Sequence, residues 1–296
     1  MNKIKRQIDL HLMIIPGIIL VFIFSYIPIF GNVIAFKDYT PLFGFENSPW
    51  VGFDNYRYVF GLQNFWQVIW NTVYIAVMKI ILELLIPIIL SLLMNEARGK
   101  LYKNSIQTAM YIPHFMSWVL LGGIFMEILA LNGPVNNVIN FFGLDSIYFL
   151  GDNAWFPIAM VMTDTWKEMG FNTIVFMAAI TSIDPQLYEA AMIDRAGRWR
   201  QTLHVTIPGM LPIIILMGAL SLGNVLNAGF DQIFTLYSPQ VYQSGDIIDT
   251  LTYRIGLVNA QFGPATAIGM FKSLVSCVLV SLSYFLASKF ANYRIF

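Results

Sequence analysis

The sequence predicts an all-helical protein that crosses a membrane several times. Of its 296 residues, 57% are hydrophobic and only 11% are charged, whereas a soluble domain carries about 25% charged residues. Apolar runs of about 20 residues or more, the length that crosses a bilayer as a helix, recur along the chain. So little polar surface indicates that lipid, rather than water, surrounds most of the chain.

Six stretches are long and apolar enough to span a bilayer. They cover approximately residues 12–36, 68–94, 106–129, 155–180, 207–236 and 264–290. The first follows a basic start, Met-Asn-Lys-Ile-Lys-Arg, but it is too long for a signal peptide and no small-residue cleavage site ends it. We therefore expect a retained first span and a single transmembrane domain over residues 1–296.

Lysine and arginine are distributed unevenly between the two sets of connections. The side that holds both termini carries Lys3, Lys5, Arg6, Arg98, Lys100, Lys103, Arg195, Arg198, Arg200, Lys289 and Arg294. The other side carries only Lys37, Arg57 and Arg254. Because positive residues accumulate in cytoplasmic segments, both termini are predicted to be cytoplasmic.

Several function classes are disfavoured. The formal net charge is zero, which gives a nucleic-acid partner no electrostatic support. None of the three histidines has metal-ligand spacing to another. Two catalytic motifs, Gly-x-Ser-x-Gly and His-Glu-x-x-His, do not occur. The ATP-binding motif Gly-x-x-x-x-Gly-Lys-Ser/Thr does not occur either, so an ATPase is expected to be a separate protein.

The predicted cytoplasmic loop at residues 181–206 is the most informative segment. Asp184 can cap a short helix that runs from Gln186 to Ile193, with Pro185 in its first turn. We expect a turn at Arg195 to Trp199 with Gly197 as its pivot. A second short helix is expected to end near Pro208.

This loop resembles the Glu-Ala-Ala loop of binding-protein-dependent importer permeases. The family pattern is Glu-Ala-Ala, three residues, Gly, nine residues and Ile-x-Leu-Pro; Glu189, Ala190, Ala191 and Pro208 match it, and Val205 and Ile207 are conservative replacements. Arg195 stands where the family has Gly.

The resemblance covers nearly the whole chain. The segments Trp50–Tyr56, Tyr111–Phe115 and Gln261–Ala265 are similar to carbohydrate-uptake permeases of type I ABC importers, in the LplB-like branch that takes up oligosaccharides. The resemblance implies several partners: a second permease, two ABC ATPases that bind ATP and Mg, an extracytoplasmic binding protein and membrane lipid. It assigns ATPase coupling to Glu189, Ala190, Ala191, Asp194, Gly197 and Pro208, and no cofactor to this chain.

The fifth predicted span carries a polar stripe. Ser221, Asn224, Asn227 and Asp231 recur at spacings of three, three and four, which places them on one face of a helix. Amides on such a face suit a hydroxyl-rich ligand, and the related maltose-type permeases take sugar contacts partly from this span. The alternative is hydrogen bonding between helices.

Aromatic residues supply further candidates for the substrate path. Tyr111, His114 and Trp118 are predicted to share a face of the third span, and Trp166 lies near the middle of the fourth. Aromatic rings stack on sugar faces; core packing is the competing interpretation.

Two other classes stay open. Glu83, Asp164 and Glu168 are acidic residues within spans, and such residues are functional candidates in a membrane-embedded enzyme or a secondary transporter. Glu83 lies four residues after Lys79, so an ion pair within that helix is the structural interpretation.

Overall fold

The computed structural model describes residues 8–97 and 99–290, and it is nearly all-helical. Strand-type pairing among these residues is limited to one bridge between Lys37 and Trp50. Lys3, Lys5, Arg6, Arg98 and Arg294, which contribute to the predicted orientation, lie outside the described residues. The chain divides into two compact units, each of which is described by itself.

The first unit holds the described residues up to Phe65 together with Thr252–Phe271. Its helices are α1 (Ile8–Val21), a π-turn (Phe22–Tyr26), a 3-10 segment (Ile27–Phe36), α2 (Gly44–Asn47), α3 (Asp54–Phe60), a π-turn (Arg254–Val258) and the start of α15 (Phe262–Phe290). Two segments of the family resemblance meet here. The Asn55 amide donates to the carbonyls of Ala35 and Lys37, both at 2.9 Å, and Gly263 leaves it room.

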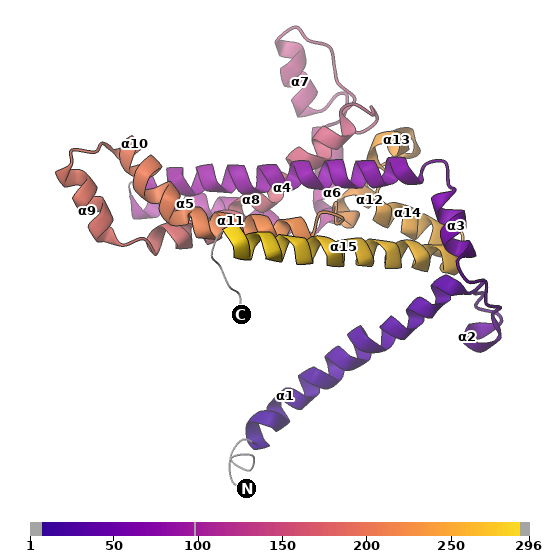
Figure 1. Ribbon diagram of the computed structural model, residues 1–296. Coiled ribbons are helices and arrows are strands. Elements are labelled where there is room, and N and C mark those ends of the chain that lie inside the picture. The colour runs from indigo at the N-terminus through magenta and orange to yellow at the C-terminus, as the bar shows by residue number, and fades with distance from the viewer. Residues whose placement is uncertain (1–7, 98, 291–296) are drawn as a thin grey trace. The chain divides into compact units, whose positions relative to one another are not determined.

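The second unit holds Trp66–Leu251 and the part of α15 from Lys272 onward. Its long helices are α4 (Phe65–Glu96), α8 (Phe156–Thr181) and α11 (Ile207–Gly223), which lie alongside one another (Figure 1). The shorter elements are α5 (Lys100–Tyr111), a 3-10 turn (Ile112–Phe115), α6 (Trp118–Ile128), α7 (Pro134–Phe141), α9 (Pro185–Ile193), α10 (Arg198–Gln201), a π-turn (Thr202–Thr206), α12 (Phe230–Leu236), a 3-10 turn (Pro239–Val241), α13 (Tyr242–Gly245) and α14 (Ile248–Tyr253).

Apolar packing joins the three long helices where α8 ends and α11 begins. Phe176, Ala179 and Ile180 of α8 are buried against Met210 of α11, and Leu84 and Ile88 of α4 complete the cluster. Close helix contacts depend on glycine: a Cβ at Gly170 of α8 would overlap the backbone carbonyl of Met110 on α5. This packing fixes α4, α8 and α11 as the frame of the second unit.

The number of membrane-length helices differs from the six expected. Among the described residues, four helices pass by length and hydropathy: Leu12–Phe36, Phe65–Glu96, Arg198–Gly223 and Phe262–Phe285. The pair Leu101–Phe115 and Trp118–Ile128 would add a fifth, but it is bent by 105°. Helix α8 is 26 residues long and carries Asp164, Lys167 and Glu168, so its hydropathy is interrupted. That α8 crosses the membrane, as the fourth of the six predicted spans, stays a prediction.

Candidate functional site: the α8–α11 loop and a polar cavity

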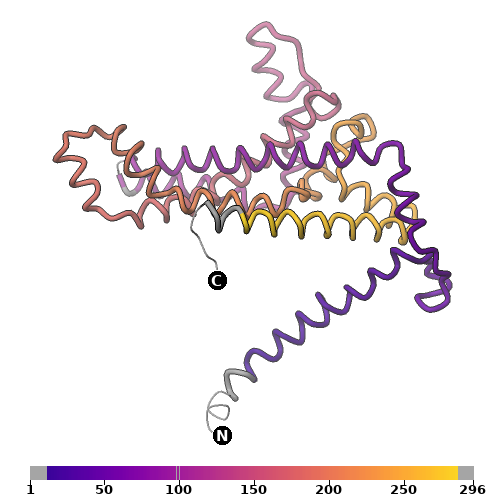
Figure 2. Tube along the Cα trace, in the orientation of Figure 1, coloured from indigo at the N-terminus to yellow at the C-terminus, as the bar shows by residue number. Residues whose placement is uncertain are grey.

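The α8–α11 loop, residues 182–206, contains the short helix that its capping residues predict. A carboxylate oxygen of Asp184 accepts the backbone N–H of Gln186 at 2.9 Å, and Pro185 occupies the first helical position. That proline removes an N–H that would have no partner within the helix. The predicted helix from Gln186 to Ile193 is therefore confirmed as α9. Figure 2 shows how the chain leaves α8, turns through α9 and α10, and returns into α11.

The pivot of the loop lies at Arg195, and the expectation that Gly197 bends the chain is wrong. Arg195 has φ 57°, in the left-handed region, whereas Gly197 has φ −66° and precedes α10. The N–H of Ala196 bonds to the Ala191 carbonyl at 2.9 Å, and that of Arg195 bonds to the Met192 carbonyl at 3.0 Å. This is a Schellman ending, in which glycine is the usual left-handed residue. Arg195, which stands at the glycine position of the family pattern, therefore adopts the left-handed conformation that glycine usually supplies at a helix end.

The second short helix does not end near Pro208, contrary to expectation. Helical structure continues from Arg198 to Gly223, with a π-turn at Thr202–Thr206 in which the Ile207 N–H bonds to the Thr202 carbonyl. Proline lacks an N–H, and its ring clashes with the carbonyl four residues earlier in a regular α-helix. The wider turn just before Pro208 accommodates it.

Helix α9 is held at its base and exposed along its length. The Tyr188 hydroxyl bonds to Thr206 Oγ1 at 2.9 Å, and the Ile183 side chain packs on Gly209 of α11. No residue of α9 is buried, and Ile193 is 83% exposed. Glu189 and Ala190 share this exposure. Exposed apolar side chains beside a fixed base indicate a surface for a partner.

A polar cavity of about 330 Å³ lies between α4, α8 and the end of α11. It is lined by Ala76, Lys79, Ile80, Glu83, Asp164, Glu168, Asn172, Ser221, Asn224, Asn227 and Gly229. Three of the four residues of the predicted polar stripe therefore reach it. The fourth, Asp231, is exposed on α12 and is not part of the lining.

The predicted continuous fifth span is wrong, because the helix breaks where the polar stripe crosses it. Helix α11 ends at Gly223, and α12 begins at Phe230 after Gly229, whose φ is 93°. Val225, Leu226 and Ala228 are buried in the break, whereas Asn224 and Asn227 are exposed. The turn, rather than one helical face, directs both amides to the cavity, and the Asn227 amide donates to Asn224 Oδ1 at 3.3 Å.

Lys79 pairs across helices instead of within α4. Its ammonium lies 3.0 Å from a carboxylate oxygen of Asp164 on α8 and donates to the Ala228 carbonyl at 2.7 Å. It also donates to the side-chain carbonyl of Gln232, which is 0% exposed. The expected ion pair with Glu83 is replaced because α8 brings Asp164 to the same ammonium.

The bend in the third predicted span separates its aromatic residues, so they do not share one helical face. His114 lies before the bend and reaches the cavity wall through Glu168, whose carboxylate is 2.6 Å from His114 Nδ1. Lys167 bonds to the same carboxylate group at 2.7 Å and lies 5.6 Å from the centre of the Trp118 ring.

The remaining aromatic candidates lie away from the cavity lining. Trp166 contacts the Phe125 ring edge-to-face at 5.6 Å between centroids, and Phe125 contacts Trp118 at 6.4 Å. Neither Trp166 nor Tyr111 is among the described residues that line the cavity. The structure thus places Trp166 in an aromatic cluster and brings only His114, through Glu168, to the polar wall.

Two polar residues of this region were not among the predicted candidates. Asn172 lines the cavity and follows Asp164 and Glu168 at successive spacings of four. That helical periodicity could have identified it. Gln232 is the one amide side chain of α12, and no pattern in the neighbouring sequence indicates that it lies beside Lys79.

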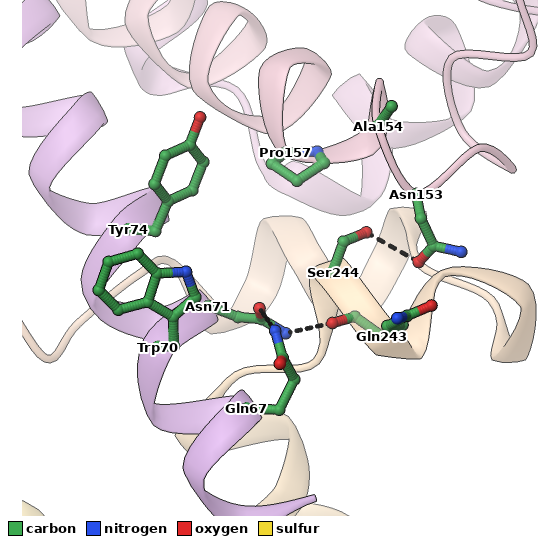
Figure 3. A pocket seen from close by; sticks show the side chains of 9 residues that line it. All are labelled: Gln67, Trp70, Asn71, Tyr74, Asn153, Ala154, Pro157, Gln243 and Ser244. Atoms are coloured by element: carbon green, nitrogen blue, oxygen red, sulfur yellow. Dashed lines mark hydrogen bonds between the residues drawn. The ribbon is translucent and has the colours of Figure 1, made fainter.

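A second hollow of about 410 Å³ lies at the start of α4 (Figure 3). Trp70 and Tyr74 are one helical turn apart there, and Pro157 and Ala154 lie across from them. The Asn71 amide donates to the Gln243 carbonyl at 3.0 Å. Tyr74 and Glu83 are two and a half turns apart at 3.6 residues per turn. The aromatic hollow and the charged cavity therefore lie on opposite sides of α4.

The membrane-length apolar helices α4 and α11 beside a polar cavity are typical of a multi-pass membrane protein. Residues 83–292 match the model of the binding-protein-dependent transport system inner membrane component, and the chain belongs to this family. Among the described residues no group of three or more His, Cys, Asp or Glu side chains is placed to hold a metal ion.

Curated relatives and solved structures cover almost the whole chain. A polygalacturonan/rhamnogalacturonan transport system permease protein of Bacillus subtilis, YteP, is 40% identical over 99% of this chain and 92% of its own length. The protein LplB of the same organism is 38% identical over 100% and 93%.

Two crystal structures share the fold. One is of a bacterial ABC transporter involved in the import of the acidic polysaccharide alginate; a chain of it is 37% identical, with a TM-score of 0.90 and coverage of 98% of both chains. The other is of the bacterial alginate ABC transporter in complex with an alginate pentasaccharide-bound periplasmic protein; it matches at 36% identity, TM-score 0.90 and 99% coverage of both chains.

Proposed function

We propose that this chain is the permease subunit of an ATP-driven importer of oligosaccharides. The observation that carries the proposal is the pairing of an exposed helix, α9, with a polar cavity along the same frame of α4, α8 and α11. The named relatives that transport polygalacturonan, rhamnogalacturonan or alginate support a carbohydrate as the substrate.

In this proposal α9 acts as a lever on the cytoplasmic side. An ABC ATPase binds its exposed face, with Glu189 as a polar anchor and the smooth surface at Ala190 and Ala191 allowing close approach. The bond between Tyr188 and Thr206 joins α9 to the π-turn that leads into α11, and the Ile183 side chain packs on Gly209 of α11. Closure of the two ATPases therefore moves α8 and α11 and alternates access to the cavity.

The partners follow from the family. A second permease completes the path, two ATPases bind ATP and Mg, and an extracytoplasmic binding protein delivers the saccharide. Gentle purification of a tagged chain should recover all three kinds of protein. A chain that is recovered alone, and that forms no crosslink to an ATPase from a cysteine placed at Glu189, would contradict the proposal.

Charge reversal tests the lever. Glu189→Lys in the assembled transporter should abolish ATPase docking and ATP-dependent uptake, because a polar anchor is replaced by a like-sized opposite charge, while the chain still inserts. Glu46→Lys is the matched control: Glu46 is also exposed, but it lies in α2. Normal docking and uptake in the Glu189→Lys transporter would remove the assigned role of α9.

A further inference from the structure

The break between α11 and α12 leaves backbone groups without helical hydrogen-bond partners within an otherwise apolar stretch. Residues 224–229 are not helical, and a carbonyl that is released from a helix inside a membrane protein needs another partner. Ala228 is fully buried, and its carbonyl accepts from the Lys79 ammonium at 2.7 Å. A side chain of α4 therefore satisfies this carbonyl of the break.

The same ammonium ties the break to α8 and α12. Its ion pair with Asp164 reaches α8, and its bond to Gln232 reaches α12. The Gln232 amide in turn donates to the Met160 carbonyl at 2.8 Å and to Thr163 Oγ1 at 2.7 Å. Three segments, namely α8, the break and α12, thus converge on Lys79 of α4, which is only 4% exposed.

Gly229 shows how closely the segment fits around the ammonium. A Cβ at this position would lie 2.8 Å from Lys79 Nζ, and φ is 93°, a conformation that other residues rarely adopt. Lys79 and Gly229 together set the course of the chain between α11 and α12. That course buries Ala228 and leaves the amides of Asn224 and Asn227 open to the cavity.

We propose that Lys79 is the positioning residue of the saccharide path: it holds residues 224–229 so that Asn224 and Asn227 present their amides to the substrate, and it does not bind the saccharide itself. The role rests on the proposed function for its substrate. Because its three acceptors already occupy the ammonium, this part of the wall recognises sugar hydroxyls through amides and does not pair with a sugar carboxylate.

The first test needs no saccharide. In a Cys277→Ser background, a cysteine is placed at Asn227 in the assembled transporter in nanodiscs, and its rate of labelling by N-ethylmaleimide is measured. Adding Lys79→Met together with Asp164→Asn removes both charges and avoids an unpaired buried carboxylate. The labelling rate should change by about tenfold or more, since a loosened support misplaces the side chain.

The matched control removes another pair of the same kind. Lys272 of α15 and Asp249 of α14 are 2.6 Å apart and partly buried, but neither lines the cavity. Lys272→Met with Asp249→Asn should leave the labelling rate at position 227 unchanged. Equal labelling rates with and without the Lys79 and Asp164 substitutions, in transporters that assemble equally well, would overturn the positioning role.

The second test separates positioning from direct binding. ATP-dependent uptake is measured with labelled oligogalacturonides and with their neutral methyl esters. The Lys79 and Asp164 substitutions should raise KM by a similar factor for both probes. A rise in KM that is confined to the acidic probe would show that Lys79 binds the carboxylate, and it would overturn the proposal.

A double-mutant cycle with Asn227→Ala completes this test. The effects of the two changes on KM should not be additive if Lys79 acts through Asn227; additive effects would contradict the inference. Absence of ATP-dependent uptake of either probe by the unmodified transporter would count against the proposed function, while the labelling experiment would still decide the role of Lys79.

Discussion

The α8–α11 loop and the polar cavity are stabilised in opposite ways. The loop owes its shape mainly to contacts between residues close in sequence, since Asp184 caps α9 and Ala196 bonds back to Ala191; the exposed ion pair of Arg198 with Glu96 of α4, at 3.0 Å, is a long-range addition. The cavity depends on contacts between distant residues, since Lys79 binds Ala228 and Asp164 on other elements. A surface that engages a partner can be built locally, whereas a polar site inside a membrane needs several helices to satisfy its charges.

The largest effect is expected where α5 packs on α8 at the frame of the cavity. Gly170→Val places a side chain against the Met110 carbonyl, and this carbonyl cannot easily move aside because it belongs to the backbone of α5. We expect a loss of about 3 kcal/mol in the free energy of unfolding, measured by thermal unfolding in detergent. Gly269→Val in α15 is the control, because open space surrounds Gly269. Equal losses for both would show that helix propensity, and not this contact, is responsible.

The next effect concerns recognition in the cavity and not its stability. Asn227→Ala removes an amide from the lining, and a lost hydrogen bond of about 1 kcal/mol raises KM for saccharide uptake roughly fivefold. The basal ATPase rate should not change. Asn140→Ala, on the distant α7, serves as the control. A reduced maximal rate with an unchanged KM would assign Asn227 to the conformational step instead.

A smaller effect is expected at the cap of α9. Asp184→Ala removes the acceptor for the Gln186 N–H and should destabilise the helix by about 1 kcal/mol. Faster hydrogen exchange of the α9 amides, with the cavity unaffected, would be the signature. Asp184→Asn should restore slow exchange because asparagine caps equally well. Exchange that spreads into α8 would show that the loop and the cavity are not independent.

The smallest effect separates the two possible pivots of the loop. Arg195→Gly removes the strain of a left-handed residue, about 1 kcal/mol, but glycine also raises the entropy of the unfolded chain by about 0.5 kcal/mol. The net stabilisation of the ending of α9 should therefore be about 0.5 kcal/mol. Gly197→Ala should be tolerated, because φ is −66° and no atom lies within 4 Å of the added Cβ. Hydrogen exchange at Ala196 reports both changes. A destabilised loop in Gly197→Ala would return the pivot to position 197.

The sequence predicts the loop better than the cavity because capping chemistry is local. Asp184 and Pro185 identify the start of α9 without reference to the rest of the chain. The left-handed Arg195 was missed, since arginine is not a residue that predicts positive φ. The polar stripe identifies three cavity residues, but it predicts a straight helix where the chain breaks.

The break could not be predicted because its support is distant in sequence. Nothing near Asn224 or Gly229 indicates that an ammonium from α4 satisfies the Ala228 carbonyl. The pairing of Lys79 with Asp164 likewise depends on helix packing, whereas the sequence alone favours a partner four residues away. The bend after Phe115 is different, because it has local signals: Pro113 lies in the turn before it, and the Ser117 side chain caps α6 by accepting the Leu120 N–H.

The convergence on Lys79 also has a consequence for how the protein is made. Lys79 is synthesised 149 residues before Ala228, an interval on the order of ten seconds at ribosomal speed. When α4 is made, the three groups that bind the Lys79 ammonium have not yet been synthesised. Asp164 arrives first and can neutralise the ammonium; the arrival of Ala228 and Gln232 then locks the pair. The order of synthesis thus sets the order in which the partners of Lys79 become available, and the turn at residues 224–229, with Gln232 just after it, becomes available last.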